Sequence, residues 1–412
     1  MSQIDQVWGA GPTARYEELA AKFRTIFDRI AAGAVQRELE RRLPYEEIRW
    51  LKEAGFGAVR IPVAEGGAGA TLPELANLLI ELSAADSNIT QALRAHFGYL
   101  EDVLSSSDER RRKKWLPRFV AGDLVGSAWS ETGAAKIGTF STKVTRQGDR
   151  SVVNGEKFYT TGSIFADWID VGVDFFDEAT GEEKPGSALV ARKAAGVKVI
   201  DDWNGFGQTV TGSGTTVFEN APVDDEDVYD DDIRFKYGAA FYQLVHLATL
   251  TGIGRAATND VAKAVAQRTR SYSHGAAAKA SQDPQVLQVV GRIRSRAYAA
   301  GAIVQKAAEA IQRAFEASFQ ADLAAEERTN AVAELETAQA QTIVTDLILE
   351  ATTILFDALG ASATLRDAAR DRYWRNARTI SSHNPRIYKD RIIGDYAVNG
   401  TTPPYQWRIG QA

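Results

Sequence analysis

The sequence predicts a mostly helical α+β protein with an N-terminal helical domain (residues 1–125), a central antiparallel β domain (126–232) and a C-terminal four-helix bundle with a tail (233–412). Three observations support this order. Apolar residues recur at helical spacing in the first domain, and the pattern changes to alternation rich in Val, Thr, Phe and Tyr over 140–220. Long alanine-rich helical stretches then follow. A chain of this length buries enough surface to need no disulfide or metal for stability.

Four helices are expected in the first domain, and each begins at a capping residue or a proline. The four starts are Thr13, Pro44, Thr71 and Asp86. The segment after Pro44 ends at Gly55, which matches the preference of helix ends for glycine. The helix after Asp86 carries His96 and Tyr99.

Turn signals divide the central region into short strands. Gln147-Gly148-Asp149 and Asn154-Gly155 interrupt alternating runs, and Asn-Gly between such runs predicts a hairpin. Residues 224–232 then hold seven carboxylates in nine positions. We predict a solvated interdomain linker there, because adjacent carboxylates repel each other, and a metal site is the alternative.

The last domain is expected to consist of long helices with short breaks. The helical stretches are 238–272, 283–317, 322–359 and 366–382. The segment Gly252-Ile-Gly254-Arg-Ala-Ala257 matches the G-x-G-x-x-A pattern of dinucleotide sites, but it lies inside a helical stretch with no strand before it. Close helix packing is therefore the better interpretation of these glycines, and we expect the chain to bind no NAD(P)H of its own.

Charge and composition argue against several classes of function. The net charge of -6 argues against nucleic acid as a partner, and the basic run at 110–114 is typical of a solvated helix face. No run of about 18 apolar residues occurs, so no membrane span is expected. The N-terminus lacks the features of a signal peptide, so the cytoplasm is the expected location. None of the four histidines has the Glu-x-x-His or His-Glu-x-x-His spacing, so no metal is expected.

Sulfur is almost absent from the sequence, which has no cysteine and one methionine, the initiator. This composition excludes disulfides, iron–sulfur clusters and thiolate zinc sites. One hypothesis is that the protein is made when sulfur is scarce, since a cell short of sulfur gains from enzymes that contain none. Drift through Leu-for-Met exchange and an engineered sequence are the alternatives.

Three segments resemble the acyl-CoA dehydrogenase family and a monooxygenase branch within it. Residues 128–134 (Ala-Trp-Ser-Glu-Thr-Gly-Ala) resemble the family's flavin loop, and residues 157–162 (Lys-Phe-Tyr-Thr-Thr-Gly) resemble its second flavin-contact strand. Residues 371–385 resemble the signature of the branch that includes dibenzothiophene monooxygenase and bacterial sulfur-acquisition monooxygenases. The resemblance covers essentially the whole chain and implies the acyl-CoA dehydrogenase fold.

Two departures from the dehydrogenases favour the monooxygenase branch. Counting forward from Arg375-Asn376, the position of a dehydrogenase catalytic glutamate holds Asn384, and an amide is no general base. A glutamate on another helix is the alternative. The turn at 359–364 lacks the second adjacent glycine of the family's turn around the adenylate half of FAD, so FMN is favoured over FAD.

The resemblance implies a two-component FMNH2-dependent monooxygenase that oxidises a small organosulfur compound (a sulfide, sulfoxide, sulfinate or sulfone) in sulfur acquisition. A separate flavin reductase supplies reduced FMN by diffusion, and O2 adds to give the flavin C4a-hydroperoxide in a site that must exclude water. The alternatives are an acyl-CoA dehydrogenase, a flavin-dependent amine N-oxygenase and a catalytically inactive helical scaffold.

The same resemblance assigns candidate site residues. The catalytic candidates are His383 and His96, and the substrate-binding candidates are Gln91, Ala95, His246 and Asn384. The flavin-binding candidates are Trp129, Ser130, Tyr159, Thr161, Arg270 and Ser362. Arg270 is expected to reach the flavin phosphate across a subunit interface, which implies a homotetramer. The alternative for each of these three histidines is a structural place in the core, and Arg94 is expected at the surface, with a sulfinate contact as its alternative.

Overall fold

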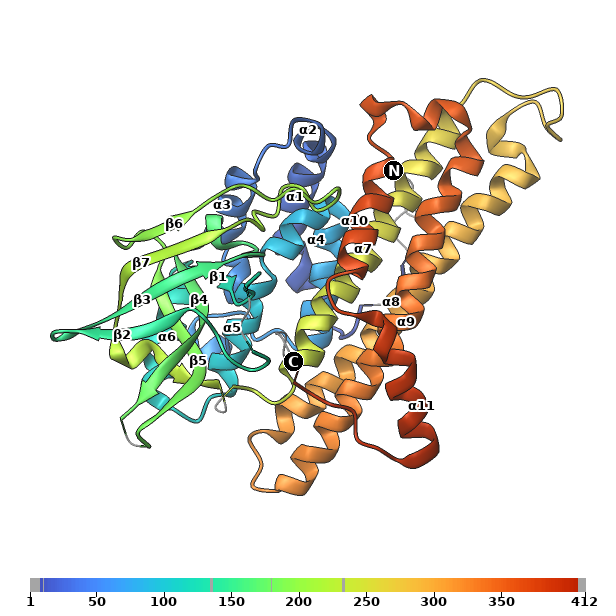
Figure 1. Ribbon diagram of the computed structural model, residues 1–412. Helices are drawn as coiled ribbons and strands as arrows, with labels where there is room; N and C mark the ends of the chain where they lie inside the picture. Colours follow the sequence, from blue (N-terminus) through green and yellow to red (C-terminus); the bar gives the residue numbers. More distant parts are fainter. Residues whose placement is uncertain (1–7, 10, 134–135, 179, 232–233, 407–412) are drawn as a thin grey trace.

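A central sheet lies between two helical parts of the chain in the computed structural model, which describes residues 8, 9, 11–133, 136–178, 180–231 and 234–406. The strands lie on one side of the molecule, the long C-terminal helices lie on the other, and the N-terminal helices lie between them (Figure 1). The predicted mostly helical α+β class is therefore confirmed. None of the described helices is long and apolar enough to cross a membrane.

The N-terminal part is helical, as the periodicity predicts. Its α-helices are α1 (Tyr16–Ala32), α2 (Ala34–Glu40), α3 (Tyr45–Glu53), α4 (Leu72–Ala92), α5 (Arg94–Ser105) and α6 (Glu109–Val120). The start of α4 has a reciprocal capping box between Thr71 and Glu74. Asp86 breaks α4 with an extended backbone (φ -160°, ψ 110°), and its Oδ1 accepts a hydrogen bond from the Asn88 N–H (3.0 Å), so it caps the helical turns that run through Leu93 into α5, which carries His96.

The central part is one sheet. Its strands are β1 (Val125–Ala128), β2 (Lys143–Gln147), β3 (Arg150–Lys157), β4 (Trp168–Asp177), β5 (Glu182–Ala191), β6 (Val197–Val199), β7 (Thr216–Val223) and β8 (Val228–Asp230). The order is β6-β7-β3-β2-β4-β5-β8, with β1 added beside β4. The predicted antiparallel pairing holds for most pairs, but β1 runs parallel to β4, and β2 meets β4 at one parallel pair, Lys143 with Asp174.

Two predictions within the sheet region have different outcomes. The turn at Gly148 joins β2 to β3 as expected, with Gln147 paired to Arg150. Asn154-Gly155 forms no hairpin, because both residues lie inside β3 where its register against β7 shifts. Gly155 adopts φ 151°, and a Cβ on it would lie 2.4 Å from Thr142 Oγ1. The glycine therefore makes a bulge, which has the same sequence signature as a turn.

The acidic segment 224–232 is also not the solvated linker that the sequence predicts. Part of it is β8, which pairs with β5 at the sheet edge. Asp227 is buried, and its carboxylate lies 2.9 Å from Lys114 Nζ. No group of three potential metal ligands occurs among the residues that the structure describes.

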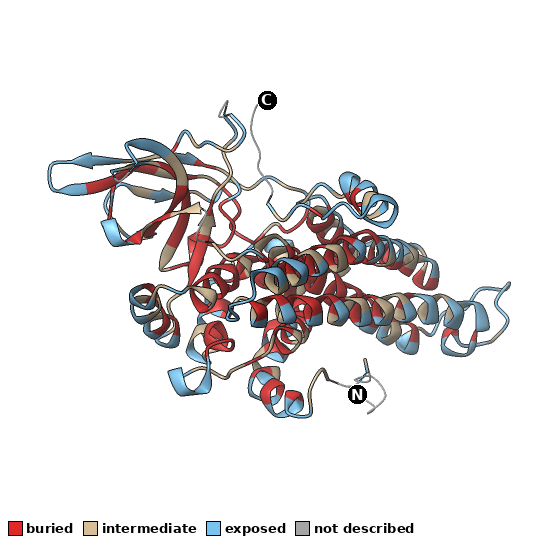
Figure 2. Cartoon of the chain, turned by 90° about the horizontal axis from the view of Figure 1, so that it is seen from below, coloured by how far each residue is buried: buried red, intermediate tan, exposed pale blue. Residues whose placement is uncertain are grey.

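The C-terminal part is built on three long helices. They are α7 (Gly238–Gln267), α8 (Pro284–Ala317) and α9 (Leu323–Leu359), followed by α10 (Asp371–Ser381) and α11 (Lys389–Asn399). The three long helices pack on one another, α4 lies along α7, and α10 lies against α7 and α9. Buried residues are concentrated where these helices meet, and the far ends of the long helices are exposed (Figure 2).

The glycines inside α7 allow this close packing. A Cβ on Gly252 would lie 2.4 Å from Ser83 Cβ and 2.6 Å from the carbonyl oxygen of Ile80, both on α4. A Cβ on Gly254 would lie 2.6 Å from a side-chain carbon of Ile348 on α9. The interpretation of this segment as a helix-packing site is confirmed.

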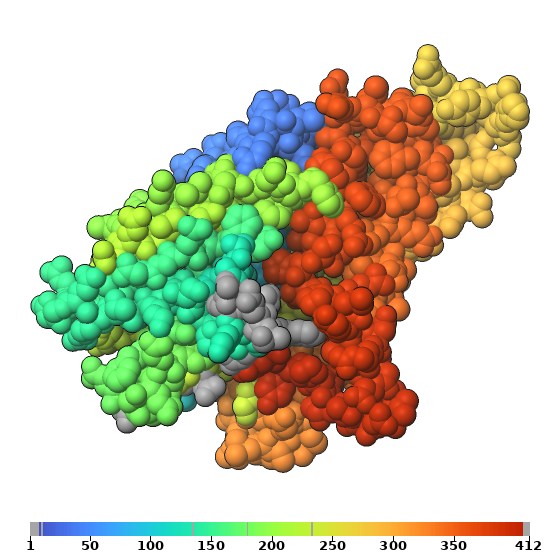
Figure 3. All heavy atoms as spheres, viewed as in Figure 1, coloured from blue at the N-terminus to red at the C-terminus, as the bar shows by residue number. Residues whose placement is uncertain are grey.

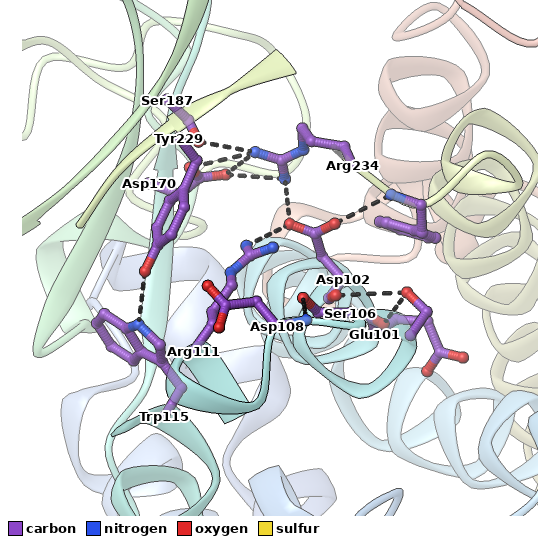
Figure 4. A network of polar contacts seen from close by, with 12 residues as sticks. Glu101, Asp102, Ser106, Asp108, Arg111, Trp115, Asp170, Ser187, Tyr229 and Arg234 are labelled. Carbon is purple, nitrogen blue, oxygen red and sulfur yellow. Dashed lines mark hydrogen bonds and ion pairs between the residues drawn. The ribbon is translucent and has the colours of Figure 1, made fainter. Parts of the chain in front are cut away.

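A buried polar network joins the first helices, the sheet and the entry to α7 (Figure 4). Asp102 on α5 accepts hydrogen bonds from Arg111 on α6 (2.5 Å) and from the backbone N–H of Phe235 (3.0 Å). Arg234 pairs with Asp170 on β4 at 3.2 Å. The basic run at 110–114 is thus not wholly solvated, since Arg111 is buried. Breaking one partner of such a buried pair is strongly destabilising, so this network fixes the parts around the candidate site.

Candidate functional site

Two histidines from distant parts of the sequence lie side by side near the start of α7. His246 is on α7, His383 follows α10, and their ring centroids are 4.4 Å apart with planes inclined by 54°. His246 is 1% exposed, and neither of its ring nitrogens has a hydrogen-bond partner among the described residues. His383 keeps an exposed surface, and its Nδ1 lies 3.0 Å from Asn384 Oδ1.

Amide side chains hold the segment after α10 in place. Asn384 donates from Nδ2 to Gln243 Oε1 on α7 (2.7 Å), and Gln341 on α9 donates from Nε2 to the Asn384 carbonyl (3.2 Å). A surface hollow of about 490 Å³ opens beside Asn384, between α10 and the start of α11. Sequence reasoning missed both glutamines, because a single amide on a long helix belongs to no motif. Another hollow, of about 400 Å³ beside α3, contains none of the predicted site residues.

Arg94, which was expected at the surface, is half-buried beside these residues. Its Nε donates to the carbonyl oxygen of Tyr242 (3.1 Å), and its guanidinium lies 4.6 Å from the centre of the Tyr242 ring. Gly98 lies one helical turn after Arg94, and a Cβ there would meet the Tyr242 ring at 2.1 Å. His246 lies one turn after Tyr242 on α7. Arg94, Tyr242 and the histidine pair therefore form a continuous cluster between α5, α7 and α10.

Burial and the nearby cation keep both histidines neutral at ordinary pH. Burial, the charge of Arg94 and the neighbouring His383 lower the pKa of His246 well below its usual value. Burial and Arg94 lower the pKa of His383 to about 4, against the opposing effect of its hydrogen bond with Asn384. Burial lowers the pKa of Arg94 to about 10, so that side chain stays charged. A neutral imidazole can both donate and accept a proton, which suits a group that steers protons.

No described carboxylate makes a hydrogen bond or ion pair with the two histidines or Arg94. The buried carboxylate of Glu334 on α9 instead accepts a hydrogen bond from the backbone N–H of Ala240 at the start of α7 (2.8 Å). Burial raises the pKa of Glu334, and the nearby Lys389 opposes this shift. The position that a dehydrogenase base would occupy by sequence holds Asn384, whose side chain is bonded to a second amide.

His96 has a structural environment. Its Nε2 donates to the carbonyl oxygen of Gly57 (2.8 Å), and its Nδ1 accepts a hydrogen bond from the Val125 N–H (3.3 Å). The ring is fully buried against Phe97 and Phe119. Both ring nitrogens make hydrogen bonds with backbone groups. We therefore infer that His96 has a structural role, in which it attaches the start of β1 to the N-terminal helices. A structural role was the alternative to catalysis in the sequence-based prediction.

The two predicted pocket positions before Arg94 are both buried. Gln91 is 3% exposed, and its Oε1 has no hydrogen-bond partner among the described residues. Ala95 is 7% exposed at the start of α5. A buried amide oxygen without a donor is costly, so Gln91 is a site where a ligand or water would be held.

The predicted flavin-contact segments meet each other just beyond the ends of β1 and β3. The Phe158 N–H donates to the Ser130 carbonyl (2.9 Å), and Trp129 Nε1 donates to Asp170 (2.9 Å). The Thr161 hydroxyl lies 2.7 Å from that of Ser213. Four of the predicted flavin residues, Trp129, Ser130, Tyr159 and Thr161, therefore belong to one local surface.

Exposed aromatic rings on this surface fit a flat ring system. Tyr159 is 50% exposed, is held in the left-handed region (φ 58°), and packs 5.9 Å from Trp203. A non-glycine residue with positive φ stores backbone strain, which is typical of functional sites. The loop after Trp203 docks on α10, where the Gln208 N–H donates to Asn376 Oδ1 (2.6 Å). Figure 3 shows the surface recessed along the line where the strands approach α10.

Arg270 and Ser362 lie at the other end of α7. Both are exposed, and their loops adjoin because Arg268 Nη1 donates to the Ala358 carbonyl (3.2 Å). At 1.5 Å per residue, about 32 Å separate His246 from Gln267, where α7 ends, and Arg270 follows three residues later. Within one subunit, the predicted phosphate contacts and the histidine pair cannot share one mononucleotide.

Comparison with known proteins places the chain in a family. The acyl-CoA dehydrogenase N-terminal domain matches residues 13–123, and the C-terminal domain matches residues 244–385. Dibenzothiophene monooxygenase from Rhodococcus erythropolis is 24% identical over 95% of this chain and 94% of its own length. The probable FMNH2-dependent monooxygenase SfnC from Pseudomonas putida is 25% identical over 92% and 94%. The crystal structure of TdsC from Paenibacillus sp. A11-2 with FMN and indole has a TM-score of 0.84 at 25% identity, and the match covers 95% of this chain and 100% of that one.

Proposed function

Because this chain belongs to the acyl-CoA dehydrogenase family, we propose that it uses the family fold as an FMNH2-dependent monooxygenase that oxidises a small organosulfur compound. The observation that carries this proposal is the pair of amides, Asn384 and Gln243, bonded to each other beside the histidine pair. An amide cannot remove an α-proton from a thioester, and general-base action is worth about 10² to 10⁴ in rate. Relatives that match over nearly their whole length are named monooxygenases, whereas two relatives named 3-sulfinopropanoyl-CoA desulfinase match over only about half of theirs.

Reduced FMN would be held by the surface around Tyr159 and Trp129, with the Ser130 and Thr161 backbone at its edge. The Tyr159 ring is exposed and Trp129 is half-buried beside it, and the Gly-poor turn at 359–364 favours FMN over FAD. When bound, the reduced flavin supplies two electrons, so that one oxygen atom of O2 goes to sulfur and the other leaves as water.

The residues around His383 would control protons and water. Because its one N–H, at Nδ1, is donated to Asn384 Oδ1, the neutral His383 imidazole would present Nε2 as a base that takes up a proton and returns it to an oxygen atom. His246 presents unpartnered nitrogens from α7, and Gln91 presents an unpartnered oxygen. Asn384 sets the orientation of His383 through Nδ1.

The proposed reaction requires a flavin reductase and neighbouring subunits as partners. The chain has no dinucleotide site of its own in the segment 252–257, so a separate flavin reductase would supply FMNH2. Arg270 of one subunit would reach the flavin phosphate of another, with Ser362 beside it, which calls for a homotetramer. The cytoplasm stays the location predicted from the sequence.

An oxygen-uptake screen tests the proposal. Chemically reduced FMN is added to the protein with sulfides, sulfoxides, sulfinates or sulfones, and amines serve as the comparison for N-oxygenation. We expect substrate-dependent product formation with sulfur compounds. Anaerobic reduction of bound flavin by an acyl-CoA would instead support the dehydrogenase, and oxidation of amines alone would support the N-oxygenase.

A further inference from the structure

Arg94 is half-buried and has no counter-charge among the described residues. Three buried arginines are neutralised: Arg37 pairs with Glu47 and Asp86, Arg60 pairs with Glu101, and Arg111 pairs with Asp102. Within the described ranges, no carboxylate forms an ion pair with Arg94, and its one hydrogen bond is from Nε to a backbone carbonyl. A guanidinium with two nitrogens that no described residue engages, beside the buried and unpartnered His246, is suited to a ligand that supplies a negative charge.

The groups around Arg94 leave space for such a ligand. Arg94 donates a hydrogen bond from Nε to the Tyr242 carbonyl oxygen. Both terminal nitrogens of its guanidinium therefore have no described protein partner. The ring of His246, 1% exposed, has no partner at either nitrogen. Its neighbour His383 is reachable from solvent and is separated from it by 4.4 Å. The cluster thus has several hydrogen-bond donors and one positive charge, but no described acid.

We propose that Arg94 and His246 form the binding site for an anionic, partly oxidised sulfur group, so that the preferred substrates of this enzyme are sulfinates and not neutral sulfides. This inference rests on the proposed monooxygenase function. A sulfinate spreads one negative charge over two oxygens, which match the fork of two guanidinium nitrogens. Its sulfur keeps a lone pair for oxygenation. Arg94 is therefore a specificity-determining residue.

Two substrates and two variants of the same kind test the proposal. The ratio of kcat/KM for methanesulfinate to that for methyl phenyl sulfide is measured for the native enzyme, Arg94→Gln and Arg255→Gln. Arg255 is the matched control, because burial also lowers its pKa to about 10, and its guanidinium lies 5.2 Å from the Trp8 ring, away from the histidine pair.

Arg94→Gln is expected to lower the ratio by roughly 10- to 100-fold, as loss of a charged hydrogen bond does. Arg94→Lys keeps the positive charge but lacks the two parallel N–H donors of a guanidinium. Its kcat/KM ratio should lie between that of the native enzyme and that of Arg94→Gln. Arg255→Gln should leave the ratio unchanged. An equal ratio in native enzyme and Arg94→Gln overturns the inference, and so does a native enzyme that oxidises neutral sulfides only, although the proposed function would then stand.

A binding measurement separates the anion site from the chemistry. Methanesulfinate should raise the Tm of the purified protein before flavin is added, and it should not raise the Tm of Arg94→Gln. If no sulfur compound is oxidised, the proposed function fails, and this difference in Tm still supports the anion site. If Arg94→Gln raises the KM for reduced FMN as much as it raises the KM for methanesulfinate, the cation serves the flavin and the inference is overturned.

Discussion

The surrounding residues determine the pKa and the protonation state of His383. Burial and Arg94 lower its pKa, so the ring is neutral at ordinary pH, while its edge remains open to solvent. Resemblance to the monooxygenase signature predicted this histidine and His246. The sequence could not predict that they are in contact, because they are far apart in the chain and only the packing of α10 on α7 joins them.

Replacing His383 with alanine should uncouple the reaction. We expect the yield of oxygenated product per O2 consumed to fall by roughly 100-fold, as loss of a proton-transfer group does, while hydrogen peroxide is still released. Product and peroxide are measured in the same assay. His274→Ala, in an exposed loop, is the control and should keep native coupling. Native coupling in His383→Ala would remove His383 from the mechanism.

His96 should make the stability of the protein depend on pH. Burial lowers its pKa to about 4 from 6.5, so between these values the unfolded chain binds a proton that the folded chain does not. The free energy of unfolding therefore falls as the pH falls from 6.5 towards 4. His96→Gln should reduce this slope by up to about 1.4 kcal/mol per pH unit.

Urea unfolding at several pH values measures this slope. His274→Gln replaces an exposed histidine and should leave the slope as it is in the native protein. An unchanged slope in His96→Gln would mean that the ring is not held neutral by the Gly57 and Val125 backbone groups.

At the scale of elements, helices were easier to predict than strands. Thr71 with Glu74 marks the start of α4, and Pro284 follows the capping residue Asp283 at the start of α8, because these signals act within one turn. The bulge at Gly155 depends on the strand β7 and the segment before β2, which lie elsewhere in the sequence. A local pattern cannot distinguish that bulge from a hairpin turn.

Two glycine substitutions in long helices should have opposite effects. Gly252→Ala should lower the free energy of unfolding by about 1–3 kcal/mol, because the new Cβ would meet Ser83 and the Ile80 carbonyl of α4. Gly291→Ala, on α8, has no atom within 4 Å of the new Cβ and should raise the free energy of unfolding by about 0.5–1 kcal/mol. Urea unfolding compares the two variants. Equal effects would contradict the close contact of α4 with α7.

Two parts of the candidate site were foreseen to different extents. The sequence segments near Trp129 and Tyr159 resemble flavin-contact segments, and a backbone hydrogen bond between Ser130 and Phe158 joins them in the structure. Gln243 was not foreseen, and Arg94 was expected at the surface, since a lone polar residue on a helix has no sequence signature. Their importance is seen only in the structure, which shows that Gln243 hydrogen-bonds Asn384 and that Arg94 has no described acidic partner.

At the scale of the whole molecule, the length of α7 requires a shared site if Arg270 contacts the flavin. Arg270→Gln should weaken FMN binding without changing the histidine pair, because His246 lies about 32 Å from the end of α7 that Arg270 follows. When Arg270→Gln and His383→Ala chains are assembled together, some sites combine an intact Arg270 with an intact His383. We therefore expect mixed assemblies to regain activity that neither variant has alone.

Light scattering and the activity of each pure variant are the controls for this mixing experiment. The native assembly should have the mass of a tetramer. Mixed assemblies that form but regain no activity would show that Arg270 and His383 do not serve a common site across an interface.

The central claim is that this protein transfers one oxygen atom of O2 to the sulfur atom of its substrate. The most direct measurement supplies isotopically labelled O2 and reduced FMN with an organosulfur substrate, and mass spectrometry follows the label. The account predicts that each product molecule gains one labelled oxygen atom per turnover and that no product forms without O2. Product oxygen that comes from water, or flavin reduction by an acyl-CoA in the absence of O2, would contradict it.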